Sequence, residues 1–457
     1  MAIKELCGDK ILLLGYGREG KSTHKYLLSK YTSLEIDIAD EKTADLIEES
    51  KPSTKTFVGT NYLDPICNYS TVIRSPGISP AKLAAQSHTS KTHITSATNI
   101  FFANCPGKII GITGTKGKST TSALTAHILK SEFNDIRLVG NIGYPMLDSL
   151  QDASSESIFV VELSSFQLED IRYSPNFSVI LNIVPEHTDH HNSFDAYIAA
   201  KSKITKFQSK KDYLFINTAF PTIKAISIHT HAIVCNFSDQ KDINSKSYFD
   251  VCDLYYLSNE KHIKLLNASD ISLLGAGNRQ NVLAATSIAS VLKLLPDNVR
   301  ESIKTFKPLP HRLEPVGEFL GIRFINDSLA TVPEAMANAL DALSPGVETL
   351  IAGGHDRGLD YSVVRDAIYR SSIKNLILFP TTGEKILEAI ADFAADRKIN
   401  VTFVSDMKEA VTASYSQTSK GKVVLMSPAS SSFNLFKDYQ DRGDQFKYFV
   451  KTIGESS

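Results

Sequence analysis

Short apolar runs alternate with longer amphipathic stretches along most of the chain. This alternation is typical of parallel β-sheets whose strands are joined by helices, so the pattern predicts an α/β fold. Residues 18–30 and 118–132 are amphipathic, directly follow an apolar run and are predicted helices. The predicted strands are residues 10–17, 34–40, 71–79, 108–114, 157–165, 177–187, 322–328, 347–354, 375–380, 401–405 and 422–428.

The pattern restarts twice, which predicts three domains. The first restart comes after Ile94, and the second follows segment 305–315, whose three prolines suit a linker. A chain of 457 residues has the length of about three ordinary domains. We therefore expect domains at residues 1–97, 98–309 and 310–457.

The charge and the cysteines exclude several classes of protein. The 49 basic and 50 acidic side chains give a net charge of −1, so no global field would attract nucleic acid or an anionic membrane. The five cysteines are scattered and never form a Cys-x-x-Cys pair, which argues against a disulfide framework or a structural zinc site. No apolar stretch reaches the ~20 residues of a membrane span. We expect a cytoplasmic monomer that binds neither nucleic acid nor a membrane.

Two glycine-rich loops are candidates for binding phosphates. "GYGREGKS" (residues 15–22) satisfies both the Gly-x-Gly-x-x-Gly pattern of dinucleotide folds and the Gly-x-x-x-x-Gly-Lys-Ser pattern of a P-loop. "GITGTKGKST" (residues 111–120) is a shortened, less regular P-loop, with Gly114 and Gly117 as the cradle and Lys118 for the phosphates.

The residues downstream of each loop decide between them. A triphosphate site also needs a hydroxyl and an acid at a neighbouring strand end to hold magnesium. The second loop has Ser119 and Thr120, and Glu162 ends an apolar run that follows. The first loop is followed by Asp40, about 20 residues on, where a dinucleotide fold has its ribose-binding acid. We expect the first loop to hold a nucleotide's diphosphate and ribose, and the second to hold ATP.

Segment 182–191, "NIVPEHTDHH", gathers metal-ligating side chains at another strand end. Glu186, His187 and Asp189 suit a magnesium site, and by residue type a zinc site is the alternative, although the His-Glu-x-x-His spacing is absent. We expect His190 and His191 at the surface.

Several motifs together resemble the Mur ligase family, most closely its glutamate-adding members. "VVELSSFQLE" (residues 160–169) is the most specific of them. "TGTKGKST" resembles the family's ATP loop, with Lys116 where asparagine is usual. "LNIVPEHTDHH" departs from the family pattern at Glu186 and His190, where aspartate and arginine are usual. Further matches, in the family's order and spacing, are "GAGNRQNVLAA", "LPHRLE", "INDS", "AGGHDRGLDY" and "SPASSSFNLFKDYQDRGDQF".

This resemblance implies a fold and a reaction. Two Rossmann-like domains flank a central P-loop ATPase-type domain with a parallel sheet; the first binds UDP and the third brings the amino acid. ATP, with magnesium as cofactor, phosphorylates the carboxylate of UDP-N-acetylmuramoyl-L-alanine, and the amine of glutamate attacks the acyl phosphate. Lys201 matches a lysine that CO2 converts to a carbamate in these enzymes. The product is a peptidoglycan precursor, which implies roles in cell-wall biogenesis, cell shape and cell division.

The resemblance also implies which residues form the site. The catalytic residues would be Lys118, Glu162, His187 and Lys201. The magnesium ligands would be Ser119, Glu162, His187 and Lys201. The ATP-binding residues would be Gly114, Thr115, Lys116, Gly117, Lys118, Ser119, Thr120, Asn278, Asn281, Arg312 and Asp327. The residues binding the UDP-substrate would be Gly17, Arg18, Glu19, Asp40, Ser75, Pro76, Gly77, Asn141, Ser164 and Gln167. Those binding glutamate would be Thr331, Arg357, Ser432 and Phe436.

One loop leaves the enantiomer of glutamate open. The family usually has Asp-Asp-Ser-Lys-Ala-Thr-Asn where this chain reads "NDSLATV" (residues 326–332), so Leu329 replaces the lysine that pairs with the substrate's side-chain carboxylate. Arg357 is a candidate substitute cation. D-Glutamate is the first expectation, and L-glutamate is the alternative.

Three other functions compete with this interpretation. A folylpolyglutamate synthetase-like ligase does not account for "ELSSFQLE" or the first domain. An NAD-dependent oxidoreductase leaves the second loop and Glu162 without a role, and a non-catalytic P-loop switch protein gives none to the N-terminal nucleotide fold.

Overall fold

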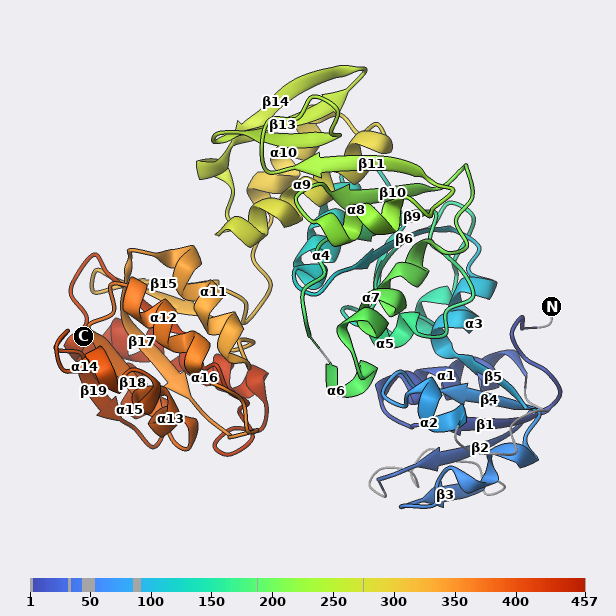
Figure 1. Cartoon of the computed structure of the whole chain (residues 1–457), viewed down its shortest axis with the longest axis horizontal. Coiled ribbons are helices and arrows are strands. Elements are labelled where there is room, and N and C mark those ends of the chain that lie inside the picture. The colour runs from blue at the N-terminus through green and yellow to red at the C-terminus, as the bar shows by residue number, and fades with distance from the viewer. Residues whose placement is uncertain are drawn as a thin grey trace. The chain divides into compact units, whose positions relative to one another are not determined.

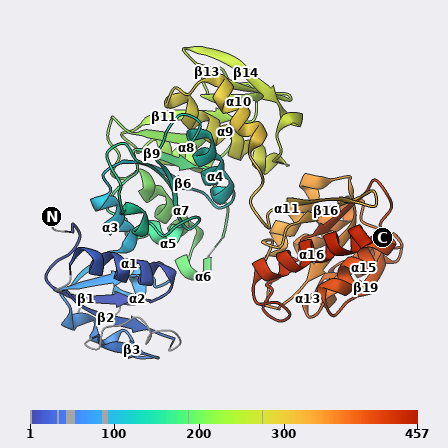
Figure 2. The same cartoon turned by 180° about the vertical axis from the view of Figure 1, so that it is seen from behind.

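The computed structural model of the chain describes residues 3–31, 34–42, 54–84, 92–186, 188–273 and 275–456. It comprises two compact units, the first Met1–Asp270 with Gln280–Thr305 and the second Ile271–Arg279 with Phe306–Ser457. The described residues of the first unit form two sheets, and those of the second unit form one. Helices pack against each sheet (Figure 1 and Figure 2).

The N-terminal sheet is parallel, with the strand order β3-β2-β1-β4-β5. Its central strand β1, Lys10–Leu14, is buried after its first residue, as apolar strands of parallel sheets are. Ile11 and Leu13 pack on one face of the sheet, and Leu12 and Leu14 pack on the other. The other elements are β2 (Glu35–Asp40), β3 (Thr56–Val58), β4 (Thr71–Arg74), β5 (His93–Ser96), α1 (Arg18–Lys30), α2 (Pro80–Ala84), α3 (Ala97–Asn104) and the 3-10 helix η1 (Asp64–Asn68).

The central sheet has the order β14-β13-β12-β11-β10-β9-β6-β8-β7. Strands β6 to β12 pair in parallel, whereas β13 and β14 continue the sheet in antiparallel fashion. The expectation of a parallel sheet is therefore corrected at this edge. The strands are β6 (Lys108–Thr113), β7 (Ile136–Gly140), β8 (Ile158–Glu162), β9 (Phe177–Ile180), β10 (Tyr213–Asn217), β11 (Ile233–Ser238), β12 (Ser247–Asp250), β13 (Asp253–Ser258) and β14 (Lys261–Asn267).

Helices join the strands of the central sheet. The second glycine-rich loop connects β6 directly to α4, most of whose side chains are buried. The helices are α4 (Lys118–Leu129), α5 (Ser165–Leu168), α6 (Thr188–His191), α7 (Phe194–Ser202), α8 (Pro221–Ser227), α9 (Ala276–Val291) and α10 (Pro296–Thr305), with the 3-10 helices η3 (Asp148–Leu150), η4 (Lys203–Thr205) and η5 (Ala268–Asp270).

The sheet of the second unit has the order β15-β16-β20-β17-β18-β19, and only the edge pair β15–β16 is antiparallel among its described strands. Helices α11, α12 and α13 contribute to the core on one face, and α15 and α16 contribute to the core on the other. The strands are β15 (Glu314–Phe319), β16 (Ile322–Asn326), β17 (Val347–Gly353), β18 (Asn375–Phe379), β19 (Asn400–Phe403) and β20 (Val423–Met426). The helices are α11 (Pro333–Leu343), α12 (Ser362–Arg370), α13 (Thr382–Ala389), α14 (Ala391–Ala394), α15 (Met407–Gln417) and α16 (Tyr439–Ser456).

The predicted strands are present in all three sheets, but the predicted linker is shorter than expected. Helix α10 ends at Thr305 and β15 begins at Glu314, so the last residues of segment 305–315 belong to the third sheet. Among the described residues, no helix is both long enough and apolar enough to cross a membrane.

Strand order decides which loops become neighbours. In the N-terminal sheet β1 lies between β2 and β4, and in the central sheet β6 lies between β8 and β9. The carboxyl ends of parallel strands share one edge of a sheet, and ligands bind where the chain order reverses. The two glycine-rich loops follow β1 and β6, so each lies at such a reversal.

Candidate active site

The first glycine-rich loop turns sharply from β1 into α1. Gly15 has a φ of +90°, and a Cβ on Gly20 would lie 2.2 Å from the carbonyl oxygen of Gly15. Only glycine fits both positions without a shift of the backbone. The amide of Tyr16 donates a hydrogen bond of 2.7 Å to the carboxylate of Asp40 at the end of β2. The loop and the predicted ribose-binding acid are thus fixed against each other.

Several residues predicted to bind the UDP-substrate come together within the first unit. Arg18 donates a hydrogen bond of 3.1 Å to the carbonyl oxygen of Gly140, at the end of β7. Gln167 Nε2 donates to Oε1 of Glu19 over 2.7 Å, and Gln167 closes a capping box with Ser164 at the start of α5. These contacts join the loop after β1 to the loops after β7 and β8.

The carboxylate of Glu19 is the unusual group in this cluster. Burial raises its pKa, and its Oε2 has no hydrogen-bond partner among the described residues. A small cavity behind the loop is lined in part by Gly15, Glu19, Arg74 and Ser75. A buried oxygen without a partner is costly unless a ligand supplies a donor. Of the remaining predicted UDP-substrate residues, Gly17 caps α1, and Pro76 and Gly77 lie in the turn after β4.

Helix α9 packs against the second glycine-rich loop. Gly117 has a φ of +85°, and a Cβ at this position would lie 2.2 Å from Oδ1 of Asn281. The same oxygen accepts a hydrogen bond of 3.1 Å from the hydroxyl of Thr121. Asn281, predicted to contact ATP, is therefore buried against the loop, whereas Asn278 is partly exposed at the start of α9.

The hydroxyl groups of the second loop differ in their surroundings. Thr115 is buried and bonds to the carbonyl oxygen of Val184 and the hydroxyl of Tyr197, and Thr120 is also buried. Ser119 is only partly buried, in the first turn of α4. Ser119 is thus the hydroxyl of this turn that a ligand at the loop could reach.

Two lysine side chains meet at one carbonyl oxygen of the second loop. Lys118 Nζ donates to the carbonyl oxygens of Gly114 and Thr115, each over 3.0 Å. Lys201 Nζ, from α7, donates to Gly114 over 2.8 Å and to the hydroxyl of Thr113 over 3.3 Å. Lys201 is only 1% exposed. Burial and then the neighbouring charge of Lys118 hold the pKa of Lys201 well below its usual range, which favours the neutral, nucleophilic amine.

Glu162 offers an oxygen atom that suits a metal ion. It is 1% exposed at the end of β8 and pairs in register with Ile112 of β6. Its Oε1 accepts a hydrogen bond of 3.1 Å from Asn141, and its Oε2 is buried without a hydrogen-bond partner among the described residues. A buried carboxylate oxygen of this kind fits a hard cation such as magnesium. His187, the predicted ligand from the loop after β9, lies outside the described residues.

In the second unit, the residues predicted to bind glutamate lie at one sheet edge. Thr331, Arg357 and Ser432 follow β16, β17 and β20, which are adjacent strands. Arg357 is exposed, and its Nη2 donates a hydrogen bond of 2.7 Å to the carbonyl oxygen of Thr331. Ser432 and Phe436 are buried. The candidate substitute cation therefore lies against the loop in which Leu329 replaces lysine.

Two residues predicted to bind ATP also lie in the second unit. Asp327 accepts hydrogen bonds from Ser427 Oγ and from the amide of Leu313, at 2.8 and 3.1 Å. Burial raises the pKa of Asp327 to about 7. Arg312 has a buried Nε atom without a hydrogen-bond partner among the described residues. Both groups therefore have capacity left for a polar ligand.

Comparison with known proteins covers nearly the whole chain. Residues 112–289 match the profile of the Mur ligase middle domain, and residues 311–430 match that of the Mur ligase glutamate ligase domain. The UDP-N-acetylmuramoylalanine–D-glutamate ligase of Clostridioides difficile is 34% identical over 98% of this chain and 100% of its own length. That of Acetivibrio thermocellus is 33% identical over 98% of both chains. The chain belongs to the Mur ligase family.

Solved structures share the fold of this Mur ligase chain. A UDP-N-acetylmuramate–alanine ligase from Thermotoga maritima has a TM-score of 0.60 at 17% identity and covers 98% of this chain and 100% of its own. A MurF ligase from the same organism, in complex with ADP, has a TM-score of 0.59 at 16% identity, covering 100% and 97% of the two chains. These similarities support the three-domain α/β architecture.

Two departures from the usual Mur ligase pattern contact each other. Lys116, in the loop after β6, forms an ion pair of 2.8 Å with Glu186, in the loop after β9. The backbone of Lys116 also exchanges hydrogen bonds with the side chain of Asn182. The sequence showed each departure separately, and the structure shows that the added lysine is matched by a carboxylate.

The expectation that His190 and His191 lie at the surface is wrong for His191. Its side chain is buried, because it packs against Phe166 of α5 and against Tyr197 of α7. His190 is partly buried and contacts the ring of Phe166. Both imidazoles lie next to the carboxylate of Glu169.

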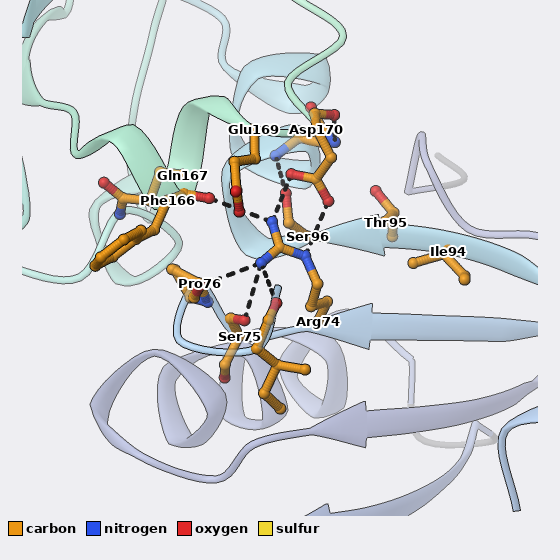
Figure 3. Close-up of polar contacts among 12 residues, drawn as sticks. Arg74, Ser75, Pro76, Ile94, Thr95, Ser96, Phe166, Gln167, Glu169 and Asp170 are labelled. Atoms are coloured by element: carbon orange, nitrogen blue, oxygen red, sulfur yellow. Dashed lines mark hydrogen bonds and ion pairs between the residues drawn. The ribbon is translucent and has the colours of Figure 1, made fainter. Parts of the chain in front are cut away.

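Arg74 is an important residue that the sequence analysis missed. Figure 3 shows its guanidinium group enclosed by the turn after β4 and by the segment around α5. It donates to the carbonyl oxygens of Ser75, Pro76 and Ile78 at 3.3, 3.2 and 2.6 Å, and it pairs with Asp170 at 2.8 Å. Arg74 thus shapes the turn predicted to bind the UDP-substrate and fixes it to the central sheet.

Arg442 of α16 has a similar role in the second unit and was also missed. It is fully buried, and burial lowers its pKa to about 9. It donates to the carbonyl and hydroxyl oxygens of Ser328 and to the carbonyl oxygen of Ser430. The loops after β16 and β20 are therefore held together by one side chain.

We predict that Arg74→Met lowers the free energy of unfolding of the first unit by about 3–5 kcal/mol, because it leaves a carboxylate and several carbonyl oxygens without their donor. Lys264→Met, which removes the exposed ion pair with Asp253 in the same unit, should leave the free energy of unfolding nearly unchanged. Urea unfolding followed by circular dichroism measures both. Equal losses in the two variants would contradict the structural role of Arg74.

Proposed function

We propose that the chain is an ATP-dependent ligase that joins D-glutamate to UDP-N-acetylmuramoyl-L-alanine, forming ADP, phosphate and a peptidoglycan precursor. The choice of this reaction rests on one observation. The chain is similar over nearly its full length to relatives named UDP-N-acetylmuramoylalanine–D-glutamate ligase. The arrangement of Lys118, Lys201 and Glu162 around the loop after β6 supports it, because phosphoryl transfer to a carboxylate depends mainly on positioning and charge.

Each proposed domain has one substrate. Residues 1–97 bind the UDP moiety with the loops after β1 and β4, and residues 98–309 bind ATP with the loop after β6. Residues 310–457 bind glutamate at the edge formed by β16, β20 and β17. Because the proposed substrates include ATP and a nucleotide-sugar, we place the protein in the cytoplasm. We also propose that it acts as a monomer.

The residues of the chain have distinct roles in the proposed reaction. Lys118 contacts the β- and γ-phosphates and neutralises charge while the L-alanyl carboxylate attacks the γ-phosphorus and ADP leaves. The glutamate amine then attacks the acyl phosphate, a proton leaves the nitrogen, and phosphate departs as the amide forms. Glu162, Ser119 and His187 would hold magnesium, which supplies charge neutralisation when bound.

Lys201 is proposed to become the fourth ligand after reaction with CO2. The neutral amine attacks CO2, a C–N bond forms, and one proton passes to solvent, which leaves a carbamate anion. The lowered pKa of Lys201 supports this step, because only the neutral amine is nucleophilic. The anion that forms is stabilised by the neighbouring charge of Lys118, which shares the carbonyl oxygen of Gly114 with Lys201.

The central test compares the two glycine-rich loops. Phosphate release is measured with UDP-N-acetylmuramoyl-L-alanine, D-glutamate and ATP. We expect Lys118→Ala to abolish release, since it removes a charge-assisted contact that strengthens in the transition state. Lys21→Ala, in the loop that formally matches a P-loop, should keep ATP turnover. Near-normal turnover of the Lys118 variant would show that the loop after β6 is not the ATP site.

A second prediction concerns the carbamate. Lys201→Ala should be nearly inactive and partly rescued by formate or acetate, whose oxygens replace those of the carbamate. Lys206→Ala, at an exposed position close in sequence, should stay active without rescue. A carbamate signal should also appear in ¹³C NMR of the magnesium-loaded enzyme supplied with labelled bicarbonate. An unmodified Lys201 in active enzyme would contradict the proposal.

A third prediction concerns the glutamate. Arg357→Met should raise the KM for glutamate about 10- to 100-fold, because a charged hydrogen bond contributes about 1.5–3 kcal/mol. Arg365→Met, which removes an exposed arginine of the same unit, should leave the KM unchanged. An unchanged KM for the Arg357 variant would remove this residue from the pocket.

The same assay should compare both enantiomers, because Leu329 occupies the position of the usual lysine. Turnover with D-glutamate alone is the expected result. Turnover with L-glutamate alone would favour the alternative substrate, and turnover with neither would remove glutamate from the proposal.

A further inference from the structure

A second group of ligating side chains lies outside the proposed magnesium site. It consists of Glu169, which follows α5, and of His190 and His191 in α6. His190 Nε2 lies 3.1 Å from Oε2 of Glu169, and His191 Nδ1 lies 3.3 Å from Oε1. One ligand atom from each residue lies within 4.8 Å of the others. No other such group of histidine, cysteine and acidic side chains occurs among the described residues.

We propose that Glu169, His190 and His191 form a binding site for a divalent transition metal ion, with zinc as the best match. In a tetrahedral zinc site, metal–ligand distances of about 2.0–2.1 Å place neighbouring ligand atoms about 3.3 Å apart. The separations of 3.1 and 3.3 Å from Glu169 are close to this value, although they involve the two different oxygen atoms of its carboxylate, and one ligand atom from each residue lies within 4.8 Å of the others. Three protein ligands leave one position for water, as in known sites with two histidines and a glutamate.

The surroundings orient the ligands in the way that metal sites require. Nε2 of His191 lies 3.0 Å from the hydroxyl of Ser165, which fixes the imidazole with Nδ1 toward Glu169. A polar contact to the nitrogen that does not bind metal is typical of metal-ligating histidines. The ring of His190 is held by Phe166, at a centroid distance of 4.2 Å. His191 is 5% exposed, so the site is largely built before an ion arrives.

The types of ligand atom distinguish this site from the proposed magnesium site. Imidazole nitrogen atoms favour zinc and similar ions, whereas magnesium prefers oxygen ligands. His190 stands where the family pattern usually has arginine, so this ligand set is a property of this chain. A bound ion would hold α6 against the end of α5, where Gln167 contacts Glu19 of α1 and Asp170 contacts Arg74 of β4.

The test is zinc binding to the full-length chain after treatment with a chelator, in the absence of nucleotide. Titration calorimetry with zinc chloride should show one site, and cobalt chloride should give the visible bands of tetrahedral cobalt. His190→Arg and Glu169→Gln should each weaken binding at least ~10-fold. His231→Arg, at an exposed position outside the group, should bind zinc as the unmodified chain does.

Three results would overturn the proposal: no zinc binding, unchanged affinity in both cluster variants, or equal weakening in the His231 variant. Zinc bound by the cysteines or by the proposed magnesium ligands would leave the affinity of the cluster variants unchanged, so adventitious binding is distinguished. Thermal unfolding in the presence of chelator checks that each variant is folded. The outcome is independent of ligase activity, because binding alone is measured.

Discussion

The carbonyl oxygen of Gly114 accepts hydrogen bonds from two lysine side chains, and the proposed chemistry of the central domain depends on this shared contact. Two ammonium groups so close together repel each other, and the protein interior screens this repulsion poorly. Burial disfavours the charged form of Lys201 and lowers its pKa. Lys118, by contrast, lies at the less buried start of α4. The two lysine side chains are therefore not equivalent, because Lys201 loses its proton more readily than an exposed lysine does.

Much of the fold and part of the site could be predicted because the signals are local. Apolar runs ending in glycine predicted β1 and β6. The distance from the first loop placed Asp40 at a strand end, and the end of an apolar run placed Glu162 at another, and the structure has both residues at those positions. Strand β14 escaped prediction because it is an edge strand whose first four residues are exposed or partly exposed, so polar residues interrupt its apolar ones. Strand β3 has only three residues, too few for a periodic pattern.

The missed residues depend on contacts between distant parts of the chain. Arg74 and Asp170 are 96 positions apart, and Arg442 and Ser328 are 114 apart. Nothing in the neighbourhood of either arginine marks it as buried. The same holds for Lys116 and Glu186. Each residue departs from the family pattern without an evident reason in the sequence, and only the fold brings the two together as an ion pair. Glutamate is longer than aspartate by one methylene, which helps this carboxylate reach the lysine.

Arg442 places a buried charge behind the edge that is proposed to bind glutamate. The hydrogen bonds that the structure gives it all go to neutral oxygen atoms of Ser328 and Ser430. These hydrogen bonds do not neutralise the positive charge of the guanidinium group, because none of them goes to a carboxylate. In a protein interior of low dielectric constant, such a charge acts over several ångströms. This buried positive charge therefore lies behind the edge formed by β16 and β20, where the buried carboxylate of Asp327 also lies. In the proposed complex with glutamate, Arg442 would supply a positive charge behind the loop in which Leu329 supplies none.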